Sequence, residues 1–270
     1  MTRFLVVPQW QGSPAARAMH LVDGAEAIAG DLPRASTARV EVPASAGEAL
    51  GTGIRRYSAL ARIADAVTDA LGQAAKPAIV VGGDCGVAVP AIAHAAEQHP
   101  DLAVVWFDAH ADLNSPATSP SGAFAGMALR AVFTDLPLPG SGAVAADRVV
   151  LAGAREFDPA EQAFVDEVGL RVLSVDDLAD PGAPAEAVAA TRASAVYIHV
   201  DLDVLDPAVI TGVGLPVPFG LTLDQLTSAI AAVRARRPLV GASIAGFAPA
   251  DPAAAVDDLG TILRVVGALA

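Results

Sequence analysis

The sequence Trp106-Phe107-Asp108-Ala109-His110-Ala111-Asp112-Leu113-Asn114 decides the fold and the chemistry that we expect of this 270-residue chain. The apolar run Leu102–Phe107 predicts a short buried strand, and Asp108, His110 and Asp112 follow it at alternate positions. Side chains alternate between the two faces of a strand, so residues spaced by two converge on one point. Carboxylate and imidazole donors arranged in this way are typical of a site for a divalent first-row metal ion.

A second stretch repeats this pattern later in the chain. Val196–Val200 is apolar apart from His199, and Asp201-Leu202-Asp203 follows it. A third expected strand leads into Gly82-Gly83-Asp84-Cys85. In an open parallel sheet, ligands bind at the carboxyl ends of the strands, so the three segments are expected at one rim.

The two aspartate clusters together offer more ligands than one ion usually takes from protein. They contain Asp108, His110, Asp112, Asp201 and Asp203. A pair of ions that share bridging carboxylates and a bridging water is the simplest arrangement, and it generates hydroxide at neutral pH.

Short apolar runs alternate with Ala-rich helical stretches along the whole chain, which predicts an α/β fold. We expect a mostly parallel eight-stranded sheet with helices on both faces. No linker is long or polar enough to divide the chain, so a single domain over residues 1–270 is expected. The expected strands are Phe4–Val7, Arg39–Val42, Ala78–Val81, Ala103–Phe107, Arg148–Leu151, Arg171–Leu173, Val196–Val200 and Leu239–Ser243. The expected helices are Pro14–Ala29, Arg55–Leu71, Val87–Gln98, Met127–Phe133, Pro159–Val168, Pro184–Thr191, Leu223–Ala235 and Asp251–Leu269.

The composition excludes several classes of protein. A formal charge of −13 and a pI near 4.6 argue against nucleic-acid binding, which needs clustered Lys and Arg. The single cysteine excludes an internal disulfide framework and favours a reducing compartment. No apolar stretch approaches 18 residues and the N-terminus has no signal-like run, so we expect a cytoplasmic protein without membrane contact. Part of the negative charge lies in the expected site, and bound cations would offset it there. The carboxylates concerned are Asp84, Asp108, Asp112, Asp201 and Asp203.

These motifs resemble those of the arginase/agmatinase/formiminoglutamase (ureohydrolase) family. Asp-Ala-His-Ala-Asp at 108–112, Gly-Gly-Asp upstream and Asp-Leu-Asp-Val-Leu-Asp-Pro downstream match in order and spacing, from about Val80 to Pro249. The resemblance implies a three-layer α/β/α sandwich, two Mn²⁺ ions, a trimer or hexamer, and hydrolysis of a C–N bond at a guanidino or formimino carbon. In the family's pattern Asp108 and Asp201 bridge the ions, Asp112 joins one ion, and His110 and Asp203 join the other.

The chain departs from the family's pattern at three positions. Cys85 stands where the family has a metal-binding histidine, either as a small buried hydrophobe or as a thiolate ligand that favours Zn²⁺ or Fe²⁺. A similar exchange occurs in the branch that hydrolyses Nω-hydroxy-L-arginine. Ala125 replaces the loop histidine that is a proposed proton shuttle, and Gly246 replaces the acidic residue that grips the guanidinium. A neutral head group is therefore expected, and Gly246→Glu is expected to restore a preference for cationic substrates.

Other positions keep the family's residues. Asn114 and Ser121 match residues that hold an α-carboxylate, and Asp158 matches one near the α-amino group, although each also suits ordinary loop hydrogen bonding. His199 shares a strand face with Asp201 and is expected to be a hydrogen-bonded core histidine rather than a partner of the metal ligands. His20, His94 and His99 are expected away from the rim, without a chemical role.

The sequence thus predicts a metallohydrolase that acts on a small molecule, in which Asp112 or Asp203 accepts a proton from the nucleophile. Amide hydrolysis is an alternative reaction. The alternative from another class is a metal-binding family member that has lost catalysis and serves as a sensor or partner subunit. That alternative stays open because the chain departs from the family's pattern at Cys85, Ala125 and Gly246.

Overall fold

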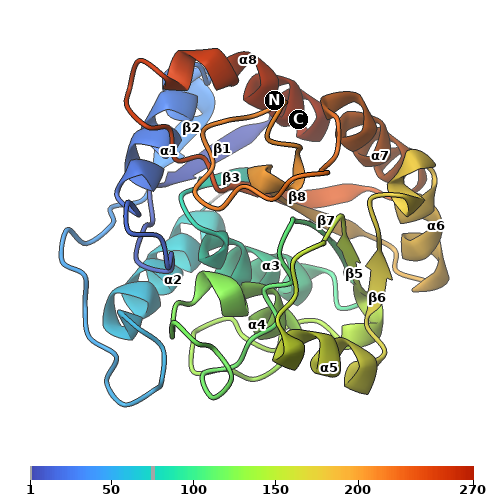
Figure 1. Cartoon of the computed structure of the whole chain (residues 1–270), viewed down its shortest axis with the longest axis horizontal. Coiled ribbons are helices and arrows are strands. Elements are labelled where there is room, and N and C mark those ends of the chain that lie inside the picture. The colour runs from blue at the N-terminus through green and yellow to red at the C-terminus, as the bar shows by residue number, and fades with distance from the viewer. Residues whose placement is uncertain (1, 74–76) are drawn as a thin grey trace.

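Strands and helices alternate in the computed structural model, which describes residues 2–73 and 77–270 (Figure 1). The described strands are β1 (Arg3–Val7), β2 (Thr37–Arg39), β3 (Ala78–Gly82), β4 (Ala103–Phe107), β5 (Val149–Ala152), β6 (Arg171–Leu173), β7 (Val196–Asp201) and β8 (Leu239–Ala245). The described helices are α1 (His20–Gly30), α2 (Tyr57–Gly72), α3 (Ala88–Gln98), α4 (Ala128–Phe133), α5 (Pro159–Val168), α6 (Ala183–Ala190), α7 (Leu223–Arg236) and α8 (Ala255–Leu269).

The strands form one sheet in the order β2-β1-β3-β8-β7-β4-β5-β6, and every pair is parallel. The expected eight-stranded sheet is confirmed, and it is parallel throughout rather than mostly so. Strand β4 pairs with β7 so that Trp106 lies opposite His199, and β7 pairs with β8 so that His199 lies opposite Ser243. This register aligns the carboxyl ends of β4, β7 and β8 at one rim.

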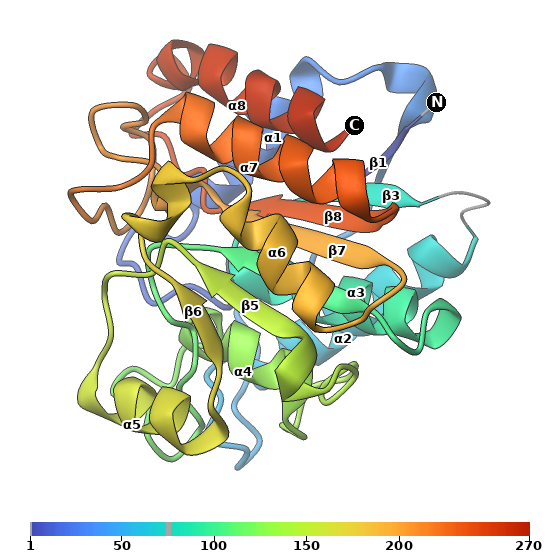
Figure 2. The ribbon, with the colours of Figure 1, turned by 90° about the vertical axis from the view of Figure 1, so that its right-hand side faces the viewer.

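Helices cover both faces of the sheet, which confirms the three layers (Figure 2). The apolar faces of α2, α3, α4 and α5 pack with Trp106 and Tyr197 in one core layer. Those of α1, α6, α7 and α8 pack with Phe107 and Ile198 in the other. Adjacent strand residues thus face opposite layers, and the central strands β4 and β7 are buried on both sides, as their continuous apolar sequences predict.

Some element ends differ from those expected. Strand β2 covers Thr37–Arg39 rather than Arg39–Val42, and the bond that Val40 N–H donates to the carbonyl of Val6 is the last one described between this segment and β1. Helix α1 begins at His20 rather than Pro14, since residues 15–19 form turns closed by short-range backbone hydrogen bonds. Asp158 and Glu161 form a capping box at the start of α5. Within residues 2–73 and 77–270, no helix combines the length and apolarity needed to cross a membrane.

Candidate metal centre

Three strand ends bring the expected ligands together at one rim. Asp108 follows β4, Asp201 ends β7, and Cys85 opens a short 3-10 turn, η2 (Cys85–Val87), after β3. All three side chains are buried. The Cys85 thiol donates to Asp201 Oδ2 at 2.7 Å and lies 3.9 Å from Asp108 Oδ2. The structure therefore places Cys85 among the carboxylates rather than in a purely apolar environment.

His110 joins the cluster from the other side. Its Nδ1 lies 3.0 Å from Asp203 Oδ2 and 3.6 Å from Asp108 Oδ1. Donor atoms of His110, Asp108 and Asp203 all lie within 4.8 Å of one another, a spacing compatible with a shared ion. Asp108 is thus close to both halves of the cluster, as a bridging carboxylate must be.

Asp112 completes the expected ligand set with an unusual backbone. Its φ of +54° lies in the left-handed region, which costs a non-glycine residue free energy and is concentrated at functional sites. The side chain is buried, and its Oδ2 has no hydrogen-bond partner within the described part of the chain. A buried carboxylate oxygen without a partner is costly, and a cation would satisfy it.

The electrostatics of the cluster also favour bound cations. Burial, together with the neighbouring Asp203, raises the pKa of Asp201 to about 7. Burial raises the pKa values of Asp108, Asp112 and Asp203 as well, with nearby carboxylates adding to the effect. Burial alone would lower the pKa of His110, but hydrogen bonds to Asp108 and Asp203 raise it to about 12. The cluster thus attracts positive charge, and divalent ions fit its oxygen, nitrogen and sulfur donors.

Backbone and tryptophan donors fix the carboxylates. Asp108 accepts from the backbone N–H of His110 and from Trp106 Nε1, at 2.7 and 3.0 Å. Asp203 accepts from the N–H of Ala109, and Asp201 accepts from the N–H of Asp203. These three carboxylates are therefore oriented before any ion binds, which lowers the cost of binding.

Gly246 lets the segment after β3 contact the end of β7, although β8 lies between these two strands in the sheet. It directly follows β8, has a φ of +88°, and donates its N–H to the carbonyl of Gly83. A Cβ at this position would lie 2.1 Å from Asp201 Oδ1. The missing side chain leaves room for the Asp201 carboxylate. The expected preference of Gly246→Glu for cationic substrates stays a prediction, but any side chain at this position would also displace Asp201.

A cleft of about 850 Å³ opens over the cluster. Its lining includes the expected substrate residues Asn114, Ser121 and Asp158. Asn114 Nδ2 donates to Asp158 Oδ2 at 2.8 Å, while Asp158 Oδ1 caps α5. The structure brings Asn114 and Asp158 together, with part of their hydrogen-bonding capacity already used within the protein.

Three residues of the cleft have roles that the sequence did not indicate. Glu161 is buried and accepts from the backbone N–H groups of Leu113 and Asp158, which ties α5 to the segment after Asp112. His20, expected away from the rim, lines the cleft at the start of α1. Asp84 also lines it, but its carboxylate accepts from Gln9, Gly12 and Gly86 and so has a structural role.

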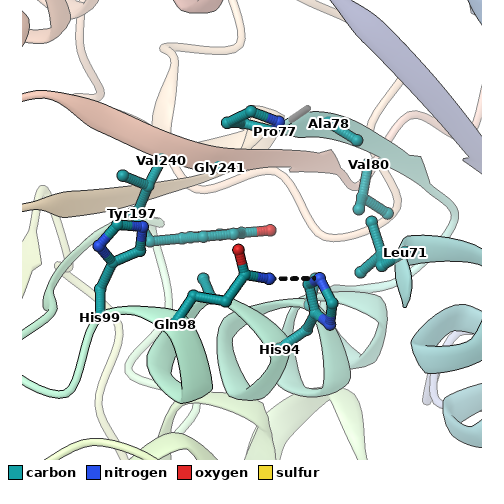
Figure 3. A pocket seen from close by; sticks show the side chains of 12 residues that line it. Leu71, Pro77, Ala78, Val80, His94, Gln98, His99, Tyr197, Val240 and Gly241 are labelled. Carbon is teal, nitrogen blue, oxygen red and sulfur yellow. Dashed lines mark hydrogen bonds between the residues drawn. The ribbon is translucent and has the colours of Figure 1, made fainter. Parts of the chain in front are cut away.

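A second cavity, of about 110 Å³, lies near the amino ends of β3, β7 and β8 (Figure 3). Its lining includes Tyr197, His94 and Gln98, and His94 pairs with Gln98 at 2.8 Å. Within the described residues, it holds no cluster of metal-type donors. The carboxylate rim is at the other end of the strands, so we place the functional site there.

Comparison with known proteins agrees with this geometry. The family model described as "Arginase family" matches residues 17–259. The chain belongs to the arginase family. It is 34% identical over 192 residues to N(omega)-hydroxy-L-arginine amidinohydrolase of Streptomyces lavendulae, covering 70% of this chain and 67% of that protein. It is also 34% identical over 179 residues to the hepatic arginase of Aquarana catesbeiana, covering 61% of this chain and 55% of that one.

Solved structures of the family share the fold. The crystal structure of Entamoeba histolytica arginase with L-ornithine superposes with a TM-score of 0.85 and 21% identity, covering 99% of this chain and 97% of that one. This likeness confirms the arginase-like architecture. The sequence matches span only 55% of the hepatic arginase and 67% of the amidinohydrolase. The family membership therefore does not by itself establish the activity of this chain.

Proposed function

We propose that this protein is a metal-dependent hydrolase that cleaves a C–N bond in a guanidino, hydroxyguanidino or formimino compound with an amino-acid-like tail. The observation that carries the proposal is the cluster of Asp108, His110, Asp112, Asp201 and Asp203 at the floor of one cleft. Two divalent ions, when bound there, supply Lewis acidity and lower the pKa of bound water.

Asp112 is the better of the two expected proton acceptors. Asp203 is already engaged, because its two oxygens contact His110 Nδ1 and the backbone N–H of Ala109. Asp112 Oδ2 is buried without a partner in the described residues and faces the same cleft.

The cleft favours a substrate whose head group is less cationic than a guanidinium. Gly246 contributes no charged side chain beside Asp201, and Ala125 contributes no proton donor to the lining. The hydroxyl of an N-hydroxyguanidine lowers the basicity of the head group. Such a substrate therefore loses the least affinity and rate from the missing carboxylate at Gly246 and the missing proton donor at Ala125. The similarity to an Nω-hydroxy-L-arginine amidinohydrolase points in the same direction. Asn114, Ser121 and Asp158 are proposed to bind the amino-acid-like tail.

Mn²⁺ is the proposed metal by family resemblance, with Zn²⁺ or Fe²⁺ as alternatives because a thiol lies in the cluster. A cytoplasmic location and a homo-oligomer, either a trimer or a hexamer, belong to the same proposal. Amide hydrolysis is the second candidate reaction. A catalytically impaired metal binder is the alternative that the missing histidine at Ala125 favours.

A hydrolysis screen tests the proposal. Protein loaded with Mn²⁺ or Zn²⁺ is incubated with hydroxyguanidino, guanidino, formimino and amide compounds, and the nitrogen-containing products are quantified. We expect turnover of at least one of the first three classes that is lost on chelation and in Asp201→Asn. Metal binding without turnover of any class would instead support the impaired binder.

A further inference from the structure

His199 lies close to Cys85 and Asp108 of the ligand cluster. It is fully buried on β7, and its ring stacks against Trp106 with ring centroids 3.8 Å apart. One of its ring nitrogens, Cys85 Sγ and an Asp108 carboxylate oxygen all lie within 4.8 Å of one another. Three donor types from three strand segments therefore surround one point on the Cys85 side of the cluster.

The hydrogen bonds of His199 leave one nitrogen free. Its Nδ1 lies 2.7 Å from Ser243 Oγ on the neighbouring strand β8. Its Nε2 is buried and has no hydrogen-bond partner within residues 2–73 and 77–270. An unsatisfied buried nitrogen costs free energy in a core histidine, whereas a lone pair directed at an ion would be satisfied. A ligating histidine typically donates its other N–H to an outer partner, the position that Ser243 occupies.

We propose that His199 is a ligand of the ion on the Cys85 side and supplies the imidazole that the family's pattern places at position 85. This inference rests on the metal site of the proposed function, and it adds a donor that the motif pattern does not include. The sequence interpretation of His199 as a core histidine accounts for its burial and its bond to Ser243 but leaves Nε2 unexplained. A thiolate, an imidazole and carboxylates together form a softer donor set, which shifts this position from Mn²⁺ towards Zn²⁺.

The test measures metal binding rather than turnover. His199→Phe keeps an aromatic ring against Trp106 but removes both nitrogens, and isothermal titration of the metal-free full chain with Zn²⁺ reports each binding step. We expect the Zn²⁺ affinity of one binding step to fall by about tenfold to a hundredfold or more. Removing only an outer hydrogen-bond partner of a ligand already causes a loss of that size. The matched control is Tyr197→Phe. It changes a buried aromatic residue on the same face of β7 whose side chain lies between the sheet and α3 (Figure 3), and its Zn²⁺ titration should match that of the wild type.

A spectroscopic measurement keeps the test independent of how well His199→Phe folds. In His110→Ala, ¹⁴N spin-echo modulation from Mn²⁺ loaded into the protein reports any remaining imidazole ligand. The proposal predicts that modulation persists in His110→Ala and is lost when His199→Phe is added. Absence of imidazole modulation in His110→Ala, or an unchanged Zn²⁺ titration of His199→Phe, would overturn the assignment. Neither result depends on hydrolysis, so failure of the proposed reaction is recognised separately.

Discussion

Gly246→Ala is a demanding test of how the rim is built. The glycine has a φ of +88°, where an L-residue is strained by about 1–3 kcal/mol. The added methyl group would lie 2.1 Å from Asp201 Oδ1, so the carboxylate must move by more than about 1 Å to reach an ordinary contact distance. Asp201 is the proposed bridge between the ions, and its displacement should weaken both metal sites. We expect affinity to fall about tenfold to a hundredfold, as when a ligand loses its positioning partner.

Isothermal titration with Mn²⁺ measures the affinity of Gly246→Ala, and urea unfolding in the presence of a chelator measures the free energy of unfolding of the metal-free variant. Gly126→Ala is the matched control, because Gly126 lines the same cleft and a Cβ there meets nothing within 4 Å. The reasoning is refuted if Gly246→Ala binds Mn²⁺ as tightly as Gly126→Ala. It is also refuted if affinity falls only in proportion to a general loss of folded protein.

Three further predictions concern the ligands and their protons. Asp201→Asn should lose most bound metal, because one bridging carboxylate serves both ions; unchanged content by elemental analysis would contradict the binuclear site. Cys85→His should raise the ratio of Mn²⁺ to Zn²⁺ affinity, and an unmoved ratio in competition titrations would mean that Cys85 only packs. The pKa of His110 near 12, against 6.5 for a free histidine, means that the metal-free folded state holds an extra proton above pH 6.5. Its free energy of unfolding should therefore fall as the pH rises from 6.5 to 8, with a slope that approaches about 1.4 kcal/mol per pH unit for this proton, and the raised pKa of Asp201, about 7, adds to the fall. Bound metal should remove this trend, and a rise in chelator-treated urea unfolding over that range would contradict the assignment.

Local sequence patterns were sufficient to predict the architecture. Buried parallel strands such as Val196–Asp201 carry continuous apolar runs, and these are visible without tertiary information. The alternation of such runs with helical stretches leaves few topologies other than a covered parallel sheet. The ends of elements were harder to predict, as at α1, where the chain from Ala15 to Ala18 forms turns that line the cleft instead of a helix.

The ligand set was also visible locally, because Asp108, His110 and Asp112 are close in sequence. The remaining features of the site depend on strand order. Gly246 approaches Asp201 only because β8 lies between β3 and β7, and His199 meets Cys85 only through the packing of side chains from three segments. Such contacts join residues far apart in the chain and leave no periodic signal. His20 and Glu161 were missed for the same reason.

The central claim is that a metal-loaded cleft without a guanidinium partner hydrolyses a neutral or weakly basic head group. The most direct measurement is the ratio of kcat/KM for Nω-hydroxy-L-arginine to that for L-arginine with the Mn²⁺-loaded wild-type protein. Loss of a charge-assisted partner and of a proton shuttle predicts a ratio of about a hundred or more. Hydrolysis of L-arginine at a comparable or higher kcat/KM would contradict the account.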